Sequence, residues 1–145
     1  MGYGKFSKNY KRTSIETAGK IDLVIMCYEK TIQLLIQARD HFNANEIEKK
    51  ARKMQKALDI INELQRCLNM KDGGQIAGNL DAIYTYLNKR LLLGDIQKDT
   101  MAFDESIRIL GELKEAWNEI ASQDKGSIGD TEGPNLPAGT AQIAA

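Results

Sequence analysis

The side chains best suited to chemistry in this sequence are one histidine, His41, and two cysteines, Cys27 and Cys67. Histidine and cysteine are common zinc ligands and common catalytic groups. A zinc site needs several such ligands at short spacings, and a di-iron helical bundle needs paired Glu-x-x-His motifs, which a single histidine cannot supply. The sequence therefore predicts neither a metal site nor metal catalysis.

A helical phosphotransfer module needs only one histidine, displayed in the middle of a helix. His41 instead lies close to the predicted helix break at residues 43–45. Cys27 and Cys67 fall inside apolar helical patterns, where a buried reduced thiol is the usual state. We therefore expect buried reduced thiols rather than a disulfide framework or a metal site, and a phosphotransfer bundle stays as an alternative function.

Other catalytic motifs are absent from the sequence. No GxGxxG, GxxxxGK[ST] or GxSxG pattern occurs, and no predicted strand precedes Gly73-Gly74, so a phosphate-binding loop is not supported. The carboxylates lie on polar helical faces and form no inward-pointing pair suited to acid–base catalysis. We expect a protein that is not an enzyme and that uses no cofactor.

Charge and hydropathy bear on the partners of the chain. The 145 residues include 20 Lys and Arg and 20 Asp and Glu, so no basic excess favours nucleic acid. There is no apolar run of about 18 residues, and residues 3–12 mix aromatic, basic and polar types unlike a signal peptide. We expect a cytoplasmic protein without membrane insertion or nucleic-acid binding.

Hydrophobic periodicity predicts four helices, at about residues 17–42, 46–70, 73–93 and 96–122. The breaks between them are short and contain Gly, Asn or Asp, and short connections favour antiparallel neighbours. The expected fold class is therefore all-α, an antiparallel up-down four-helix bundle.

The ends of the chain differ in composition from this bundle domain of residues 17–122. Residues 1–16 show no regular period and carry three aromatic side chains, of which Tyr10 is the best candidate anchor, so we interpret them as an N-terminal arm. Residues 123–145 hold both prolines of the chain and few large apolar side chains. They are expected to form a disordered tail.

The first two predicted helices each carry a second apolar stripe beside the main one. Its members are Leu23, Cys27, Leu34, Ile60, Leu64 and Cys67. A peripheral bundle helix normally needs one apolar face. The second face could therefore pack against another helix of the same bundle or against a foreign segment.

The third predicted helix is the most apolar segment of the chain. Its core stripe, at a spacing of three or four residues, is Ile76, Leu80, Ile83, Leu87 and Leu91. Tyr86 and Leu93 lie outside this stripe, where another molecule could reach them.

The same helix resembles the family of the flagellar export chaperone FliS. Its residues follow the family's GGxIAxNLxxLYxY…RL pattern in order and spacing, at Gly73, Gly74, Ile76, Ala77, Asn79, Leu80, Tyr84, Tyr86, Arg90 and Leu91. Asp99 and Glu115-Ala116-Trp117 also correspond, and the resemblance covers about residues 10–121. Upstream the agreement is looser, because the family's proline and Asp-Gly have no counterpart and Cys27 replaces a leucine.

The resemblance implies a cytoplasmic chaperone that binds the disordered C-terminal segment of flagellin, prevents premature polymerisation and keeps flagellin competent for flagellar type III secretion. The expected contact residues are Leu23, Cys27, Leu34, Ile60, Leu64, Cys67, Tyr86 and Leu93. The arm with Tyr10 is expected to cover part of the groove in the free protein. The flagellar export gate and regulatory proteins are further candidate partners, and a helical adaptor for another segment is an alternative function.

Overall fold

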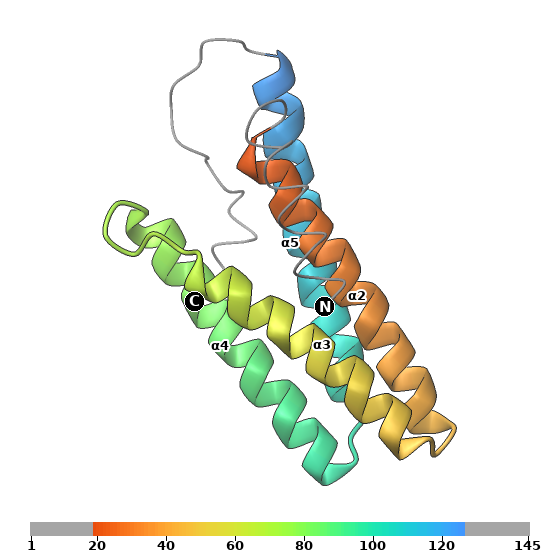
Figure 1. Cartoon of the computed structure of the whole chain (residues 1–145). Coiled ribbons are helices and arrows are strands. Elements are labelled where there is room, and N and C mark those ends of the chain that lie inside the picture. The colour runs from red at the N-terminus through yellow and green to blue at the C-terminus, as the bar shows by residue number, and fades with distance from the viewer. Residues whose placement is uncertain (1–18, 127–145) are drawn as a thin grey trace.

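The computed structural model describes residues 19–126, which form four α-helices joined by short turns (Figure 1). The helices are α2 (Lys20–Asn43), α3 (Ile47–Arg66), α4 (Gly74–Gln97) and α5 (Met101–Gly126). The described range contains no strand. The predicted all-α four-helix bundle is confirmed, whereas the expected arm and most of the expected tail lie outside the described residues.

The four helices form a ring in which each packs against two others. Helix α2 contacts α3 and α5, and α4 contacts α3 and α5, while the diagonal pairs make no close backbone contact. Consecutive helices run in opposite directions, and the α2–α3 and α4–α5 connections lie at the same end of the bundle (Figure 1). We call this end, which holds residues 44–46 and 98–100, the turn end.

The core of this ring contains the side chains that the helical period places inside. Leu80, Ile83, Leu87 and Leu91 of α4 are buried as predicted, and Ile76 is half-buried. Tyr28, Tyr84 and Phe103 are the largest fully buried side chains. The core therefore includes residues from all four helices.

A hydrogen-bonded group links three helices inside this apolar core. The hydroxyls of Tyr28 on α2 and Tyr84 on α4 lie 2.6 Å apart, and Nε1 of Trp117 on α5 donates to the Tyr28 hydroxyl at 3.0 Å. A polar group buried without a partner would be costly, so these bonds favour one alignment of the three helices. Tyr84 and Trp117 belong to the FliS-like pattern, and Tyr28 corresponds to a tyrosine in the looser upstream part of the resemblance.

The prediction that α4 ends before Gly94 is wrong, because the helix continues to Gln97. A Cβ atom added at Gly94 would lie 2.3 Å from the Cβ of Ala102 on α5. Glycine therefore lets the last turn of α4 approach the first turn of α5. The helix ends at Lys98, whose φ of 56° is left-handed.

The other helix ends also differ from the expected positions. Helix α5 begins at Met101 rather than 96, where the Met101 N–H donates to Asp99 Oδ1 at 3.0 Å. Helix α3 ends at Arg66 rather than 70, because Asn69 organises a turn in which its Oδ1 accepts from the Asp72 N–H at 3.0 Å. Helix α5 also continues beyond residue 122 to Gly126.

Candidate functional site

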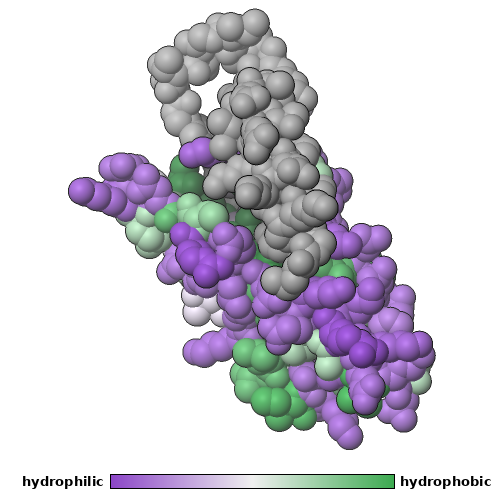
Figure 2. Space-filling view, viewed as in Figure 1, coloured by the Kyte–Doolittle hydropathy of each residue, from purple (hydrophilic) through white to green (hydrophobic). Residues whose placement is uncertain are grey.

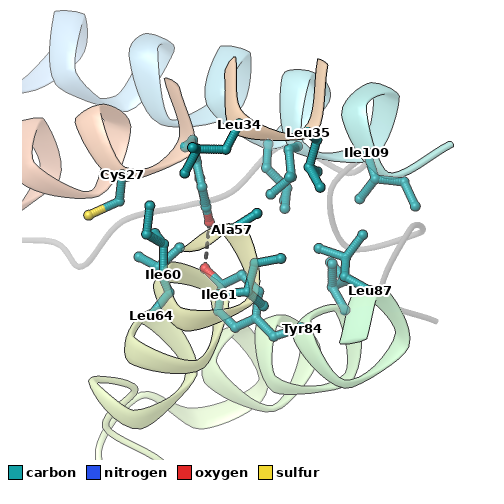
Figure 3. Packing of buried hydrophobic residues seen from close by; sticks show 14 of the residues in the cluster. Cys27, Leu34, Leu35, Ala57, Ile60, Ile61, Leu64, Tyr84, Leu87 and Ile109 are labelled. Atoms are coloured by element: carbon teal, nitrogen blue, oxygen red, sulfur yellow. Dashed lines mark hydrogen bonds between the residues drawn. The ribbon is translucent and has the colours of Figure 1, made fainter. Parts of the chain in front are cut away.

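Four of the eight predicted contact residues lie in the core. Leu34 and Ile60 are each 2% exposed, and Cys27 and Leu64 are also buried. Figure 3 shows Cys27 and Leu34 on α2 facing Ile60 and Leu64 on α3. The second apolar faces of α2 and α3 thus pack within the bundle, and the assignment of these four residues to flagellin stays a prediction.

The other four predicted contact residues are accessible. Leu23 is half-buried, and Cys67, Tyr86 and Leu93 are exposed. The expected burial of Cys67 is wrong, because α3 ends one residue earlier and Cys67 occupies the C-cap. Neither cysteine forms a disulfide in the described part of the chain.

Four of the large apolar side chains that are exposed in the described residues lie where α4 ends and α5 begins. They are Leu92 (48% exposed), Leu93 (49%), Ile96 (76%) and Met101 (68%). We call these four residues the bundle-end patch. Figure 2 shows a hydrophobic area at the lower end of the molecule, where α4 finishes.

Three members of this patch, Leu92, Ile96 and Met101, were not among the contact residues predicted from the sequence. A helix break was predicted at Gly94. The prediction therefore did not place Ile96 on the same helical face as Leu93 and Leu92, which precede it by three and four residues. The available signal was a small residue on each side of the turn at residues 98–100, Gly94 before it and Ala102 after it. Small residues at these positions favour two helices in close contact rather than a helix end at Gly94.

A polar cluster lies beside the patch, one turn before Leu93. The Tyr86 hydroxyl donates to Glu105 Oε2 at 2.7 Å, and Arg90 Nε donates to Glu105 Oε1 at 2.7 Å. Arg90 Nη1 also lies 3.5 Å from Asp99 Oδ2. Tyr86, Arg90 and Asp99 all belong to the FliS-like pattern, and here they join α4 to the start of α5.

The charges in this polar cluster stabilise one another. The hydrogen bond from Arg90 is the main cause of a lowered pKa at the Glu105 carboxyl. The hydrogen bond to ionised Glu105 in turn raises the pKa of the Tyr86 phenol. The tyrosine is therefore a neutral donor near pH 7, with its ring 44% exposed on the α4 surface.

A second ion pair holds the last turn of α4 against α3. Lys50 Nζ pairs with Asp95 Oδ1 and lies 5.5 Å from the centre of the Phe42 ring. The Lys50 side chain is only 8% exposed. Because Asp95 directly precedes Ile96, this pair helps to fix the position of the bundle-end patch.

The described residues contain no group of His, Cys, Asp and Glu able to hold a metal ion. Nδ1 of His41, the candidate phosphate acceptor, lies 2.9 Å from Glu46 Oε1 at the turn end. Within the same range, no helix is long and apolar enough to cross a membrane.

Together the fold and these surfaces define a class: a helical binding protein with accessible apolar side chains on α4. Comparison with known proteins identifies a family within this class. The family model described as "Flagellar protein FliS" matches residues 3–124. The chain therefore belongs to the FliS family.

Curated relatives agree with this assignment over most of their length. The flagellar secretion chaperone FliS of Vibrio cholerae is 35% identical over 115 residues, which cover 77% of this chain and 85% of the relative. The flagellar secretion chaperone FliSB of Pseudomonas aeruginosa is 33% identical, over 81% of this chain and 96% of the relative. FliS of Salmonella typhimurium is 31% identical, over 79% of this chain and 88% of the relative. The family gives this chain the role of a flagellar export chaperone, which is not an enzymatic role.

Proposed function

We propose that this chain binds the C-terminal segment of flagellin in the cytoplasm, prevents its premature polymerisation and keeps it competent for flagellar type III secretion. The observation that carries the proposal is the exposed apolar surface of α4, next to the cluster of Tyr86, Arg90 and Asp99. A chaperone for a disordered client needs such a surface in its folded state.

The binding mode follows from the helical surface. A disordered segment with amphipathic stretches can lay its apolar residues on α4 and become helical there. Ordering this segment costs free energy, so affinity must come from a large contact area rather than from one deep pocket. Masking would be stoichiometric and would require no nucleotide.

The two groups of predicted contact residues have different roles under this proposal. Tyr86 and Leu93 on α4, with Leu23 and Cys67 on the α2 and α3 surfaces, are accessible to the client without separation of the four helices. The buried group, which includes Leu34 and Ile60, could contact the client only if α2 and α3 separated. We therefore assign the first contacts to the accessible group.

The test is the polymerisation of purified flagellin followed by light scattering. An equimolar amount of the chain is expected to suppress seeded polymerisation, and an excess of free flagellin C-terminal segment is expected to restore it by competition. Polymerisation at an unchanged rate, with no flagellin co-eluting with the chain in size-exclusion chromatography, would remove the proposal.

The proposed role of the arm is tested separately, since Tyr10 lies outside the described residues. If residues 1–12 cover part of the client surface, their deletion should increase the affinity for the flagellin segment. Their removal ends the competition for that surface. An unchanged or lower affinity, measured by fluorescence anisotropy, would show that the arm does not compete.

A further inference from the structure

The exposed side of α3 carries a row of positive charges. Residues 49–56 hold five cationic and no acidic side chains, although the whole chain has 20 of each kind. Lys50 is buried and pairs with Asp95, whereas the other four cations follow one another at i, i+3, i+4 and i+7. This spacing places them on one face of the helix. We call these four residues, Lys49, Arg52, Lys53 and Lys56, the basic stripe.

Three charges of the basic stripe have no partner in the described part of the chain. Lys49 Nζ lies 3.4 Å from Glu46 Oε2, but Arg52, Lys53 and Lys56 form no ion pair among the described residues. Arg52 and Lys56 are exposed, and Lys53 is half-buried. Their counter-charges must therefore come from solvent ions or from another molecule.

Two exposed carboxylates of α3, Glu48 and Asp59, lie at one edge of the stripe, close to Arg52. Asp59 Oδ1 accepts from Gln55 Nε2 at 2.9 Å, and neither carboxylate forms an ion pair in the described range. At 100° per residue, both are about 120–140° around the helix from Lys53. The net positive charge is therefore greatest at the other edge, which carries Lys53 and Lys56.

This positive edge borders α2. Lys56 precedes Ile60 by four residues, and Ile60 faces Cys27 and Leu34 of α2 (Figure 3). Lys30 follows Cys27 by three residues and precedes Leu34 by four, so it lies on the same side of α2. Its side chain is exposed and forms no ion pair in the described residues. The surface shared by α2 and α3 thus gains a further positive charge.

The basic stripe and the exposed surface of α4 lie on different sides of α3. Asn62 Oδ1 accepts from Asn88 Nδ2 at 3.0 Å, and Gln65 Nε2 donates to Asp81 Oδ1 at 2.9 Å. These bonds mark the side of α3 next to α4, which is about 120–180° around the helix from Lys53. A molecule bound to the stripe would therefore leave α4 accessible.

The arrangement of these cations does not stabilise α3. Like charges three or four residues apart on a helix repel, and the stripe contains four such pairs: Lys49–Arg52, Lys49–Lys53, Arg52–Lys56 and Lys53–Lys56. Lys49 also lies in the first turn, where the helix dipole disfavours a cation. A helix that needed only a solvated face could alternate the two signs of charge. The stripe therefore indicates an anionic partner.

The composition of the stripe favours a lipid surface over a protein or a nucleic acid. Protein interfaces are centred on apolar or aromatic side chains and are poor in lysine, and residues 49–56 hold no exposed large apolar side chain. Single-stranded nucleic acid needs aromatic side chains for base stacking, and this segment has none. Flexible ammonium groups suit lipid phosphates, which move freely in the plane of a bilayer.

We propose that the basic stripe, together with Lys30, docks the chain on a membrane surface rich in anionic phospholipid, by charge attraction and without insertion of a helix. With α3 parallel to the bilayer, the cations reach the lipid headgroups together. Each adds to the attraction, which decays within a Debye length of the surface. The inference goes beyond the proposed function and involves no flagellin.

Docking is tested by flotation of the full chain with lipid vesicles. Vesicles of phosphatidylcholine with about 30% phosphatidylglycerol should bind the chain at about 0.05 M salt and release it at about 0.5 M salt. Vesicles of phosphatidylcholine alone should not bind it. Equal binding to the two kinds of vesicle, or binding to neither, would overturn the proposal.

The position of the lipid contact is tested with the double variant Lys53→Glu/Lys56→Glu. It should lower the partition coefficient onto anionic vesicles about tenfold or more, because four units of positive charge are lost from the contact. The matched control is Lys71→Glu/Lys89→Glu, which makes the same change in net charge at exposed residues outside the stripe. Its loss should stay below about threefold. Equal losses in the two variants would overturn the assignment of the contact to α3.

Thermal unfolding separates docking from a structural role of the stripe. Lys53→Glu replaces two repulsive pairs, with Lys49 and Lys56, by attractive ones, so the Tm should stay the same or rise while vesicle binding falls. A lower Tm together with the loss of binding would assign the stripe to folding and overturn the proposal.

The last comparison is with a nucleic acid. If polyuridylate bound the full chain at about 0.05 M salt and anionic vesicles did not, the stripe would be a nucleic-acid site and the proposal would be overturned. Because these experiments contain no flagellin, their failure would leave the proposed function standing.

Discussion

At the scale of single residues, the Tyr28 hydroxyl is the point at which α2, α4 and α5 are joined by hydrogen bonds. It accepts from Trp117 Nε1 and shares a hydrogen bond with the Tyr84 hydroxyl. Removing the Tyr28 hydroxyl leaves the Tyr84 hydroxyl and Trp117 Nε1 buried without these partners. Removing the Tyr84 hydroxyl leaves the hydrogen bond from Trp117 to Tyr28 intact.

This difference predicts unequal losses of stability. Tyr28→Phe should lower the free energy of unfolding by about 2 kcal/mol and Tyr84→Phe by about 1 kcal/mol. Urea denaturation followed by the fluorescence of Trp117, the single tryptophan of the chain, measures both. A smaller loss for Tyr28→Phe than for Tyr84→Phe would contradict the central position of Tyr28.

The same residues predict a dependence of stability on alkaline pH. Burial raises the pKa of Tyr28 from 10.0 to about 12, and burial also raises the pKa of Tyr84. Because these pKa values are higher in the folded state, their contribution is fully present below the unfolded pKa near 10 and is lost as pH rises through the folded pKa. The free energy of unfolding, measured between pH 9 and about 12, should fall less steeply in Tyr28→Phe.

At the scale of helices, Gly94 allows the last turn of α4 to lie close to the first turn of α5. Gly94→Ala should lower the free energy of unfolding by about 1–3 kcal/mol, because its new methyl group would overlap Ala102. Adding Ala102→Gly should restore part of the loss by removing the opposing methyl group. Thermal or urea denaturation of the single and double variants tests this coupling.

The control for this prediction is Gly78→Ala in the same helix. A Cβ atom at Gly78 would have no heavy atom within 4 Å, so the substitution should stabilise α4 by about 0.5–1 kcal/mol. If Gly94→Ala behaved like Gly78→Ala, the close contact between α4 and α5 would not be needed.

Helix number, order and the α4 core stripe could be predicted from the sequence, because the 3.6-residue period of apolar residues is strong. The end of α4 could not, because glycine is both a common helix stop and a residue that allows close packing. Distinguishing these roles at Gly94 requires knowing that Ala102 lies opposite.

The second stripes of α2 and α3 show the same limit. In a closed ring each helix has two neighbours, so α2 needs one apolar face for α3 and another for α5. Periodicity identified both faces but not what covers them. The exposure of Tyr86 and Leu93 agrees with their predicted place outside the core stripe, since only one stripe of α4 enters the core.

At the scale of the whole molecule, the core and the binding surface share α4. One face of this helix carries Leu80, Ile83, Leu87 and Leu91 into the core, while Tyr86 and the bundle-end patch remain exposed. The bundle can therefore offer an apolar surface without exposing its core, which is what a chaperone for a disordered client requires.

The most direct test of this account is calorimetric titration of the full chain with the C-terminal segment of flagellin at several temperatures. We expect one segment to bind per chain, with a negative heat-capacity change that reports the burial of apolar surface on α4. The absence of binding, or binding without a negative heat-capacity change, would contradict the account.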